Sequence, residues 1–74
     1  MDKLAAAQQM DKYAQAFATA MQETGVRNTT VAVYLGGSIN YSNVSQWRTG
    51  RRPIPAEYAP ALSVLLNIPP EAIS

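Results

Sequence analysis

Apolar side chains recur at helical spacing in the first third of the chain. Met10, Phe17 and Met21 are seven and four residues apart and therefore share one side of a helix. The positions around them are rich in Ala, Gln and Lys, which favour helices, and Gly25 is a typical stop signal. The pattern predicts an amphipathic helix over about residues 2–24. We interpret its apolar stripe as part of the core; a ligand groove is the alternative.

A second, shorter helix is predicted through Val31 to Leu35, beginning just after residue 28 or 29. Asn28 or Thr29 can cap its first turn, and two successive glycines follow its last residue. The β-branched residues of this segment would also suit a strand. We expect a helix, because the segment is short and capped and the chain offers no partner strand.

A third helix is predicted over residues 41–49. Asn40 can cap its first turn, and Gly50 can end it in a left-handed conformation. Val44 and Trp47 fall on one side, which indicates a packing face. We interpret Trp47 as a core residue; the alternative is a platform on which a base stacks. The opposite side carries the polar side chains Tyr41, Ser42, Ser45 and Gln46.

The last third of the chain is punctuated by prolines. Residues 51–55 should be extended, because a residue that precedes proline is pushed out of the helical region. A looser turn at 56–59 then leads into a helix over about residues 60–66. A final short turn should bring Ile68 or Ile73 onto the core.

Composition excludes several classes of protein. Seventy-four residues without cysteine or histidine make one domain with neither a disulfide nor a nitrogen- or sulfur-ligated zinc site. No apolar run approaches the roughly 18 residues of a membrane span, and no signal peptide opens the chain. Met1 looks like a true start, so we expect a cytoplasmic protein, and the predicted elements indicate an all-α fold.

Positive charge is concentrated in the middle of the chain. Residues 25–55 hold four arginines and no acidic side chain, a net charge of +4, whereas residues 1–24 carry −1 and residues 56–74 carry −2. Phosphates would use this excess through counterion release. A solvated basic face without function is the alternative.

Enzymatic function is not expected. Without His or Cys, and with only five scattered acids, the chain offers no nucleophile–base pair and no metal cluster. Gly36 and Gly37 lack the rest of any nucleotide-binding motif. We therefore predict no cofactor and no metal.

Four short elements stand out between Thr29 and Ile73: Ile39-Asn40, Val44-Ser45-Gln46-Trp47, Gly50-Arg51-Arg52-Pro53-Ile54-Pro55 and Leu65-Leu66-Asn67-Ile68. In these elements the segment resembles the lambda-repressor-like helix-turn-helix superfamily, in particular small Cro-type phage regulators and YdaS-like proteins. The resemblance implies a compact bundle of four to five helices that forms a single DNA-binding domain over residues 1–74, with a helix-turn-helix over about residues 29–49 whose third helix lies in the major groove.

The same resemblance implies which side chains touch DNA. Those expected to read bases are Tyr41, Ser42, Ser45 and Gln46. Those expected to contact phosphates are Thr30, Asn43, Arg48, Thr49, Arg51 and Arg52. The Gln46 amide has the donor and acceptor that suit adenine, with an ordinary exposed amide as the alternative. For Tyr41, the alternative to a contact with DNA is a partly buried aromatic side chain in the first turn of the helix.

Two positions depart from the family pattern. Tyr34 stands where the family has a small alanine facing the turn, and Ser38 stands where it has a glycine. Either the turn is shifted by one or two residues or Tyr34 points elsewhere, which leaves the register of the second helix and the contact by Thr30 open.

The function that the resemblance implies is that of a sequence-specific regulator of transcription. We expect a Cro-like repressor of a phage or prophage that acts in the bacterial cytoplasm by occupying a double-stranded DNA operator. Pairing as a homodimer on a pseudo-palindromic site would place half-sites about 34 Å apart. Candidate dimer surfaces are residues 2–10, which we expect to project or fray, and residues 65–71. The alternative is a protein-interaction module, such as an antirepressor or an antitoxin partner.

Overall fold

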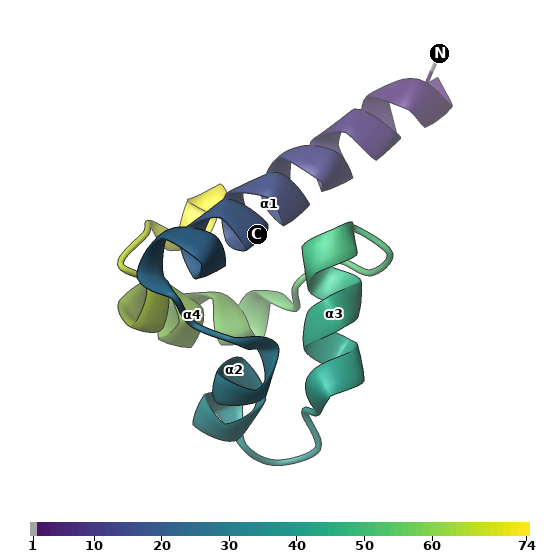
Figure 1. Cartoon of the computed structure of the whole chain (residues 1–74). Coiled ribbons are helices and arrows are strands. Elements are labelled where there is room, and N and C mark those ends of the chain that lie inside the picture. The colour runs from purple at the N-terminus through teal and green to yellow at the C-terminus, as the bar shows by residue number, and fades with distance from the viewer. Residues whose placement is uncertain (1) are drawn as a thin grey trace.

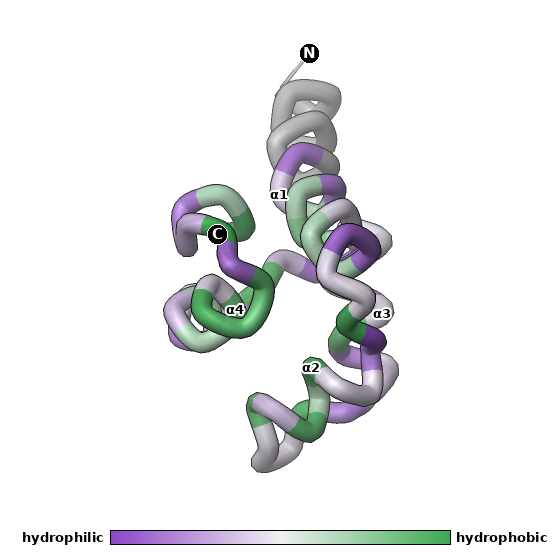
Figure 2. Tube along the Cα trace, turned by 60° about the vertical axis from the view of Figure 1, so that its left-hand side comes forward, coloured by the Kyte–Doolittle hydropathy of each residue, from purple (hydrophilic) through white to green (hydrophobic). Residues whose placement is uncertain are grey.

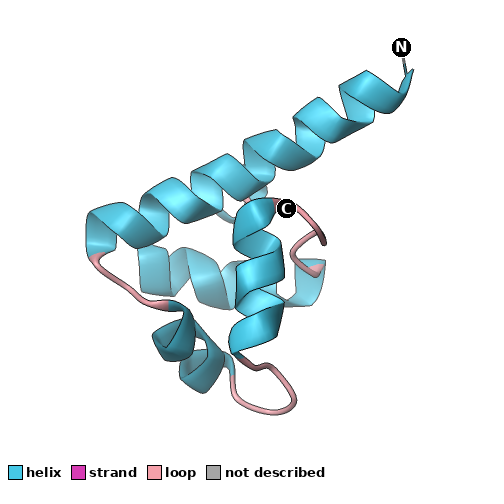
Figure 3. Ribbon diagram, turned by 45° about the vertical axis from the view of Figure 1, so that its right-hand side comes forward, coloured by secondary structure: helices cyan, strands magenta, loops and turns pink. Residues whose placement is uncertain are grey.

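Helices account for all of the regular secondary structure over residues 2–74, the part of the chain that the computed structural model describes; side chains are described from Lys12 onward. No strand occurs within these residues, so the prediction of an all-α fold is confirmed (Figures 1 and 3). The elements are α1 (Asp2–Thr24), α2 (Asn28–Leu35), α3 (Tyr41–Thr49), a 3₁₀ turn (Ala56–Tyr58), α4 (Ala59–Leu66) and a second 3₁₀ turn (Pro70–Ala72).

Helix α1 has the predicted bounds and sets the longest dimension of the molecule. Its 23 residues rise by about 35 Å, against a longest molecular extent of 38 Å. The C-terminal half of α1 lies over the other helices, whereas its N-terminal half extends beyond them (Figure 1). Phe17 and Met21 are fully buried, which confirms the apolar stripe as core. The side chain of Met10 lies outside the described residues.

Helix α2 is a helix as predicted, but it is not capped as predicted. Asn28 is its first helical residue, and the preceding residue, Arg27, takes the extended N-cap conformation without a side-chain cap. The expected cap from Asn28 or Thr29 is therefore wrong, because both residues stand inside the first turn of the helix and not at its N-cap position.

The connection from α2 to α3 explains the departure at Tyr34. Gly36 and Gly37 both have positive φ, of 68° and 62°, which glycine adopts without a steric penalty. They extend the turn, and the small residue that α2 buries is Ala32 rather than its neighbour two positions on. Tyr34 points outward and is 47 % exposed.

The C-terminal segment follows its prolines closely. A 3₁₀ turn precedes α4, which begins at Ala59 with Pro60 in its first turn, where a missing N–H costs little. Asn67 ends α4 in the left-handed conformation. The last turn then brings Ile73 fully into the core, while Ile68 is half-buried against it. Green dominates α4 in Figure 2, whereas α3 is mostly purple to white.

Trp47 of α3 occupies the centre of the core, as predicted. Its indole meets the Phe17 ring of α1 edge-on, with centroids 6.3 Å apart, and lies 5.9 Å from the Tyr58 ring just before α4. Trp47 is only 4 % exposed, and the half-buried Tyr58 covers it from the rim of the core. The other side chains that the core buries are Phe17, Ala20, Met21, Val31, Ala32, Val44, Ile54, Ala59, Leu62, Leu66 and Ile73.

We predict that Trp47→Ala unfolds the domain. Loss of a buried aromatic costs about 3–5 kcal/mol, which is comparable to the whole stability of so small a core. Circular dichroism should show lost helicity, and a cooperative melt should disappear. The control is Val64→Ala on α4, because Val64 is 77 % exposed and its loss should leave the melting curve unchanged. Native helicity in Trp47→Ala would contradict the central role of the indole.

Candidate nucleic-acid interface

Helix α3 has a clear inner and outer side. Val44 and Trp47 are buried, and at about 100° per residue the opposite side is formed by Ser42, Ser45, Gln46 and Thr49. The structure therefore brings three of the four predicted base-reading residues onto one face. Ser42 is exposed, whereas Ser45 and Gln46 are half-buried. Tyr41, the fourth, is 59 % exposed and lies on the flank of α3 that faces α2.

The two ends of α3 are fixed by local hydrogen bonds. The Asn43 backbone N–H donates to Asn40 Oδ1 over 3.1 Å, and the Asn40 N–H donates to Asn43 Oδ1 over 2.9 Å. This reciprocal capping box satisfies two N–H groups at the start of the helix. At the other end, Gly50 closes the helix in the left-handed conformation, with φ of 80°. The predicted cap and stop are both confirmed.

Two of the predicted phosphate contacts have side chains that already serve the helix. The Asn43 amide oxygen accepts the bond that completes the capping box. The Thr49 hydroxyl donates to the carbonyl oxygens of Ser45 and Gln46, at 3.1 and 3.3 Å. These internal bonds reduce what Asn43 and Thr49 can offer a ligand, although Thr49 remains exposed.

A groove runs between the start of α2 and the adjoining flank of α3. Arg48 Nη1 donates to Asn28 Oδ1 across it over 2.9 Å, and Asn28 is only 7 % exposed. The first N–H groups of α2 have no side-chain cap, so the positive end of the helix dipole opens toward the groove. Arginines 27 and 48 add two charges. The groove is lined by Val26, Arg27, Asn28, Thr29, Tyr41 and Arg48.

Sequence reasoning missed three of these groove residues, Arg27, Asn28 and Thr29. Arg27 stood within the basic segment and directly before a predicted helix, which is the signal that could have identified it. Thr30, the phosphate contact predicted in their place, is exposed in a shallow groove further along α2, which Thr29, Val33 and Tyr34 also line. The structure therefore does not bring Thr30 together with Arg48.

Arg51 and Arg52 follow the C-terminal end of α3 and are both exposed. The Arg52 backbone N–H donates to the Gln46 carbonyl oxygen over 3.3 Å, which ties the loop to α3. Cationic side chains consequently lie on the α2 side of α3 and also beyond its last turn.

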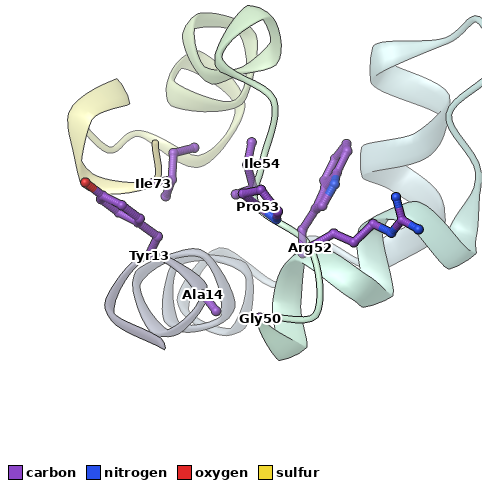
Figure 4. Close-up of a pocket in the computed structure, with 8 residues that line it drawn as sticks. Tyr13, Ala14, Gly50, Arg52, Pro53, Ile54 and Ile73 are labelled. Atoms are coloured by element: carbon purple, nitrogen blue, oxygen red, sulfur yellow. The ribbon is translucent and has the colours of Figure 1, made fainter. Parts of the chain in front are cut away.

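A small, partly enclosed hollow lies beside Trp47, between α1 and the last turn of the chain (Figure 4). Its walls are mostly apolar, and its volume of about 30 Å³ is of the order of one water molecule. The guanidinium of Arg52 extends away from it (Figure 4). Tyr13, Ile54 and Ile73 line it, and it offers no room for a small-molecule ligand.

Neither a metal centre nor a membrane span is found in the part of the chain searched. Over the described residues, no three His, Cys, Asp or Glu side chains gather closely enough to hold an ion. No described helix combines the length and the apolar character that crossing a bilayer requires. Comparisons with models of protein families, with curated proteins and with solved structures find no match to this chain.

We predict that Asn40→Ala destabilises the domain through the start of α3. Loss of the N-cap side chain costs about 1 kcal/mol, which lowers the Tm of a domain of this size by about 4–8 °C. Thermal unfolding followed by circular dichroism measures it. Ser42→Ala, two residues further on and exposed, should not lower the Tm. An unchanged Tm in Asn40→Ala would show that the capping box does not hold the helix start in solution.

Proposed function

We propose that this protein binds double-stranded DNA sequence-specifically and regulates transcription by occupying an operator. In this proposal α2 and α3 form a helix-turn-helix, and α3 enters the major groove. The observation that carries it is the division of α3 into two sides. Val44 and Trp47 anchor one side in the core, and Ser42, Ser45 and Gln46 present hydroxyl and amide groups on the other. Such groups match the donors and acceptors of base edges.

The arginines support the proposal by their position around α3. Arg48 and Arg27 line the groove on the α2 side, and Arg51 and Arg52 follow the end of the helix. A duplex that receives α3 in its major groove has a phosphate backbone on each side of that helix. Phosphate contacts from both flanks would fix the orientation of α3, while the polar face reads sequence. The uncapped start of α2 is also a suitable place for a phosphate.

The proposal includes a Cro-like mode of action in a phage or prophage. A single α3 reads only a few base pairs, so useful affinity calls for a homodimer on a pseudo-palindromic operator. A repressor of this kind works in the bacterial cytoplasm, where the DNA is.

A protein-interaction module is the second candidate, and one observation favours it. Val33 and Tyr34 on the outer face of α2 are 81 % and 47 % exposed, and they line a shallow groove with Thr29 and Thr30. An antirepressor or antitoxin partner would use such an apolar surface to bind a protein.

A salt titration against labelled duplexes separates the two candidates. Counterion release requires the logarithm of the binding constant to fall linearly and steeply with the logarithm of salt concentration. Selection from random oligonucleotides should also yield a palindromic motif. Weak binding with a shallow salt slope and no enriched sequence would overturn the DNA-binding proposal in favour of the interaction module.

We predict that the double variant Arg51→Ala/Arg52→Ala weakens binding to cognate and random duplexes by similar factors. Each lost phosphate contact reduces the salt slope by about 0.9, so the slope should fall by about 1.8 if both contacts are made. Lys12→Ala is the control, because it removes a positive charge from an exposed position on α1. A full slope in the double variant would show that the two arginines are not phosphate anchors.

We predict that Gln46→Ala weakens cognate binding selectively. A bidentate amide–base pair is worth about 1–3 kcal/mol of discrimination, which corresponds to about 5- to 150-fold in affinity. Binding to random duplex and the salt slope should hardly change, because no charge is lost, and the selected motif should become degenerate at one position per half-site. Gln22→Ala, at an exposed amide on α1, is the matched control. Equal losses on cognate and random duplexes would show that Gln46 does not read a base, and the reading role would move toward Tyr41 and Asn43.

A further inference from the structure

The bond between Asn28 and Arg48 joins two elements that are 20 residues apart in the chain. Arg48 Nη1 donates to Asn28 Oδ1 over 2.9 Å. Among the residues whose side chains are described, Asn28 is the only polar one that is buried, with 7 % exposure, whereas Arg48 is exposed. The acceptor is therefore held firmly, and the donor stands at the surface of the groove.

The Asn28 side chain bonds to Arg48 and does not cap helix α2. Asparagine is among the best N-cap residues, yet Asn28 stands one position after the N-cap and bonds to Arg48 instead. The start of α2 is left without a side-chain cap. An amide in this position thus contributes to the groove between α2 and α3 rather than to its own helix.

The chemistry of the pair preserves the charge of the arginine. A guanidinium has five N–H donors, and the bond to Asn28 occupies a single nitrogen of Arg48. The acceptor is a neutral amide, so the guanidinium keeps its full positive charge, which a carboxylate partner would offset. Arg48 remains able to donate to a second, anionic group.

We propose that Asn28 is a positioning residue that holds Arg48 ready for a DNA phosphate in the groove between α2 and α3. This role rests on the proposed function. A long arginine side chain otherwise loses rotamer freedom when it binds, and Asn28 removes that cost in advance by fixing the guanidinium in the groove that Arg27 and Tyr41 also line. Preorganisation of one such side chain corresponds to about 2- to 12-fold in affinity.

The experiment is a double-mutant cycle on the full chain, with a labelled random-sequence duplex as the probe, since a phosphate contact is independent of sequence. The variants are Asn28→Ala, Arg48→Ala and their combination. Asn28→Ala should bind about 2- to 12-fold more weakly than the wild type with an unchanged salt slope, because the charge of Arg48 remains. Arg48→Ala should lower the slope by about 0.9. In that background Asn28→Ala should have no further effect on binding.

Arg51→Ala provides the matched background, because Arg51 is an exposed arginine outside this groove. The full effect of Asn28→Ala should persist there. Melting curves for every variant ensure that binding is compared between folded proteins. If Asn28→Ala does not fold, Asn28→Ser takes its place in the cycle, because serine is favoured near helix N-termini and is too short to reach Arg48.

The outcomes separate this role from the function on which it rests. A wild-type protein without salt-dependent binding to the duplex overturns the proposed function. Normal wild-type binding together with an Asn28→Ala effect that is the same with and without Arg48 assigns Asn28 a purely structural role and overturns the positioning role alone. Wild-type affinity in Asn28→Ala overturns it equally.

Discussion

The packing of Trp47 is the contact on which the orientation of α3 depends. The indole lies between Phe17 of α1 and Tyr58 just before α4, so one side chain ties three parts of the chain together. Its burial sets the rotation of α3 about its axis, and with it which residues face solvent. Because Val44 is also buried in the core, the polar residues on the opposite side of α3 face outward. The candidate site is thus a consequence of the core.

The two ends of α3 are fixed by local hydrogen bonds and backbone conformation, independently of the core. The capping box between Asn40 and Asn43 defines the first turn, and Gly50 defines the last. The capping box uses the Asn43 side chain, which the resemblance to known regulators alone would assign to a contact with DNA. Asn43 shows the general point: a polar residue near a reading face can be needed by the helix itself, and only its hydrogen-bond partner reveals which role it fills.

The four arginines of residues 25–55 lie close to α3 in the fold. A net charge of +1 for the whole chain conceals four arginines between residues 25 and 55. In the fold they lie around α3, on the flank shared with α2 and after its last turn. The acidic residues Glu57 and Glu71 lie on the two 3₁₀ turns near the C-terminus. The molecule therefore presents an uneven field although its total charge is small, which is what steering toward a polyanion requires.

The sequence by itself determined the helices and most of their ends. Gly25, Asn40 and Gly50 act through backbone conformation and hydrogen bonds to near neighbours, so their effects can be predicted without knowledge of the fold. The inward placement of Trp47 was equally predictable from spacing. Only the tertiary structure decided how α2 sits. The turn through Gly36 and Gly37 buried Ala32 and exposed Tyr34.

The partnership of Asn28 with Arg48, 20 residues away along the chain, likewise belongs to the tertiary structure. Its two side chains meet because α2 and α3 pack on the same core. The hydrogen bond and the burial of Asn28 depend on all the contacts that hold the two helices together. A sequence pattern, in contrast, records only neighbours along the chain.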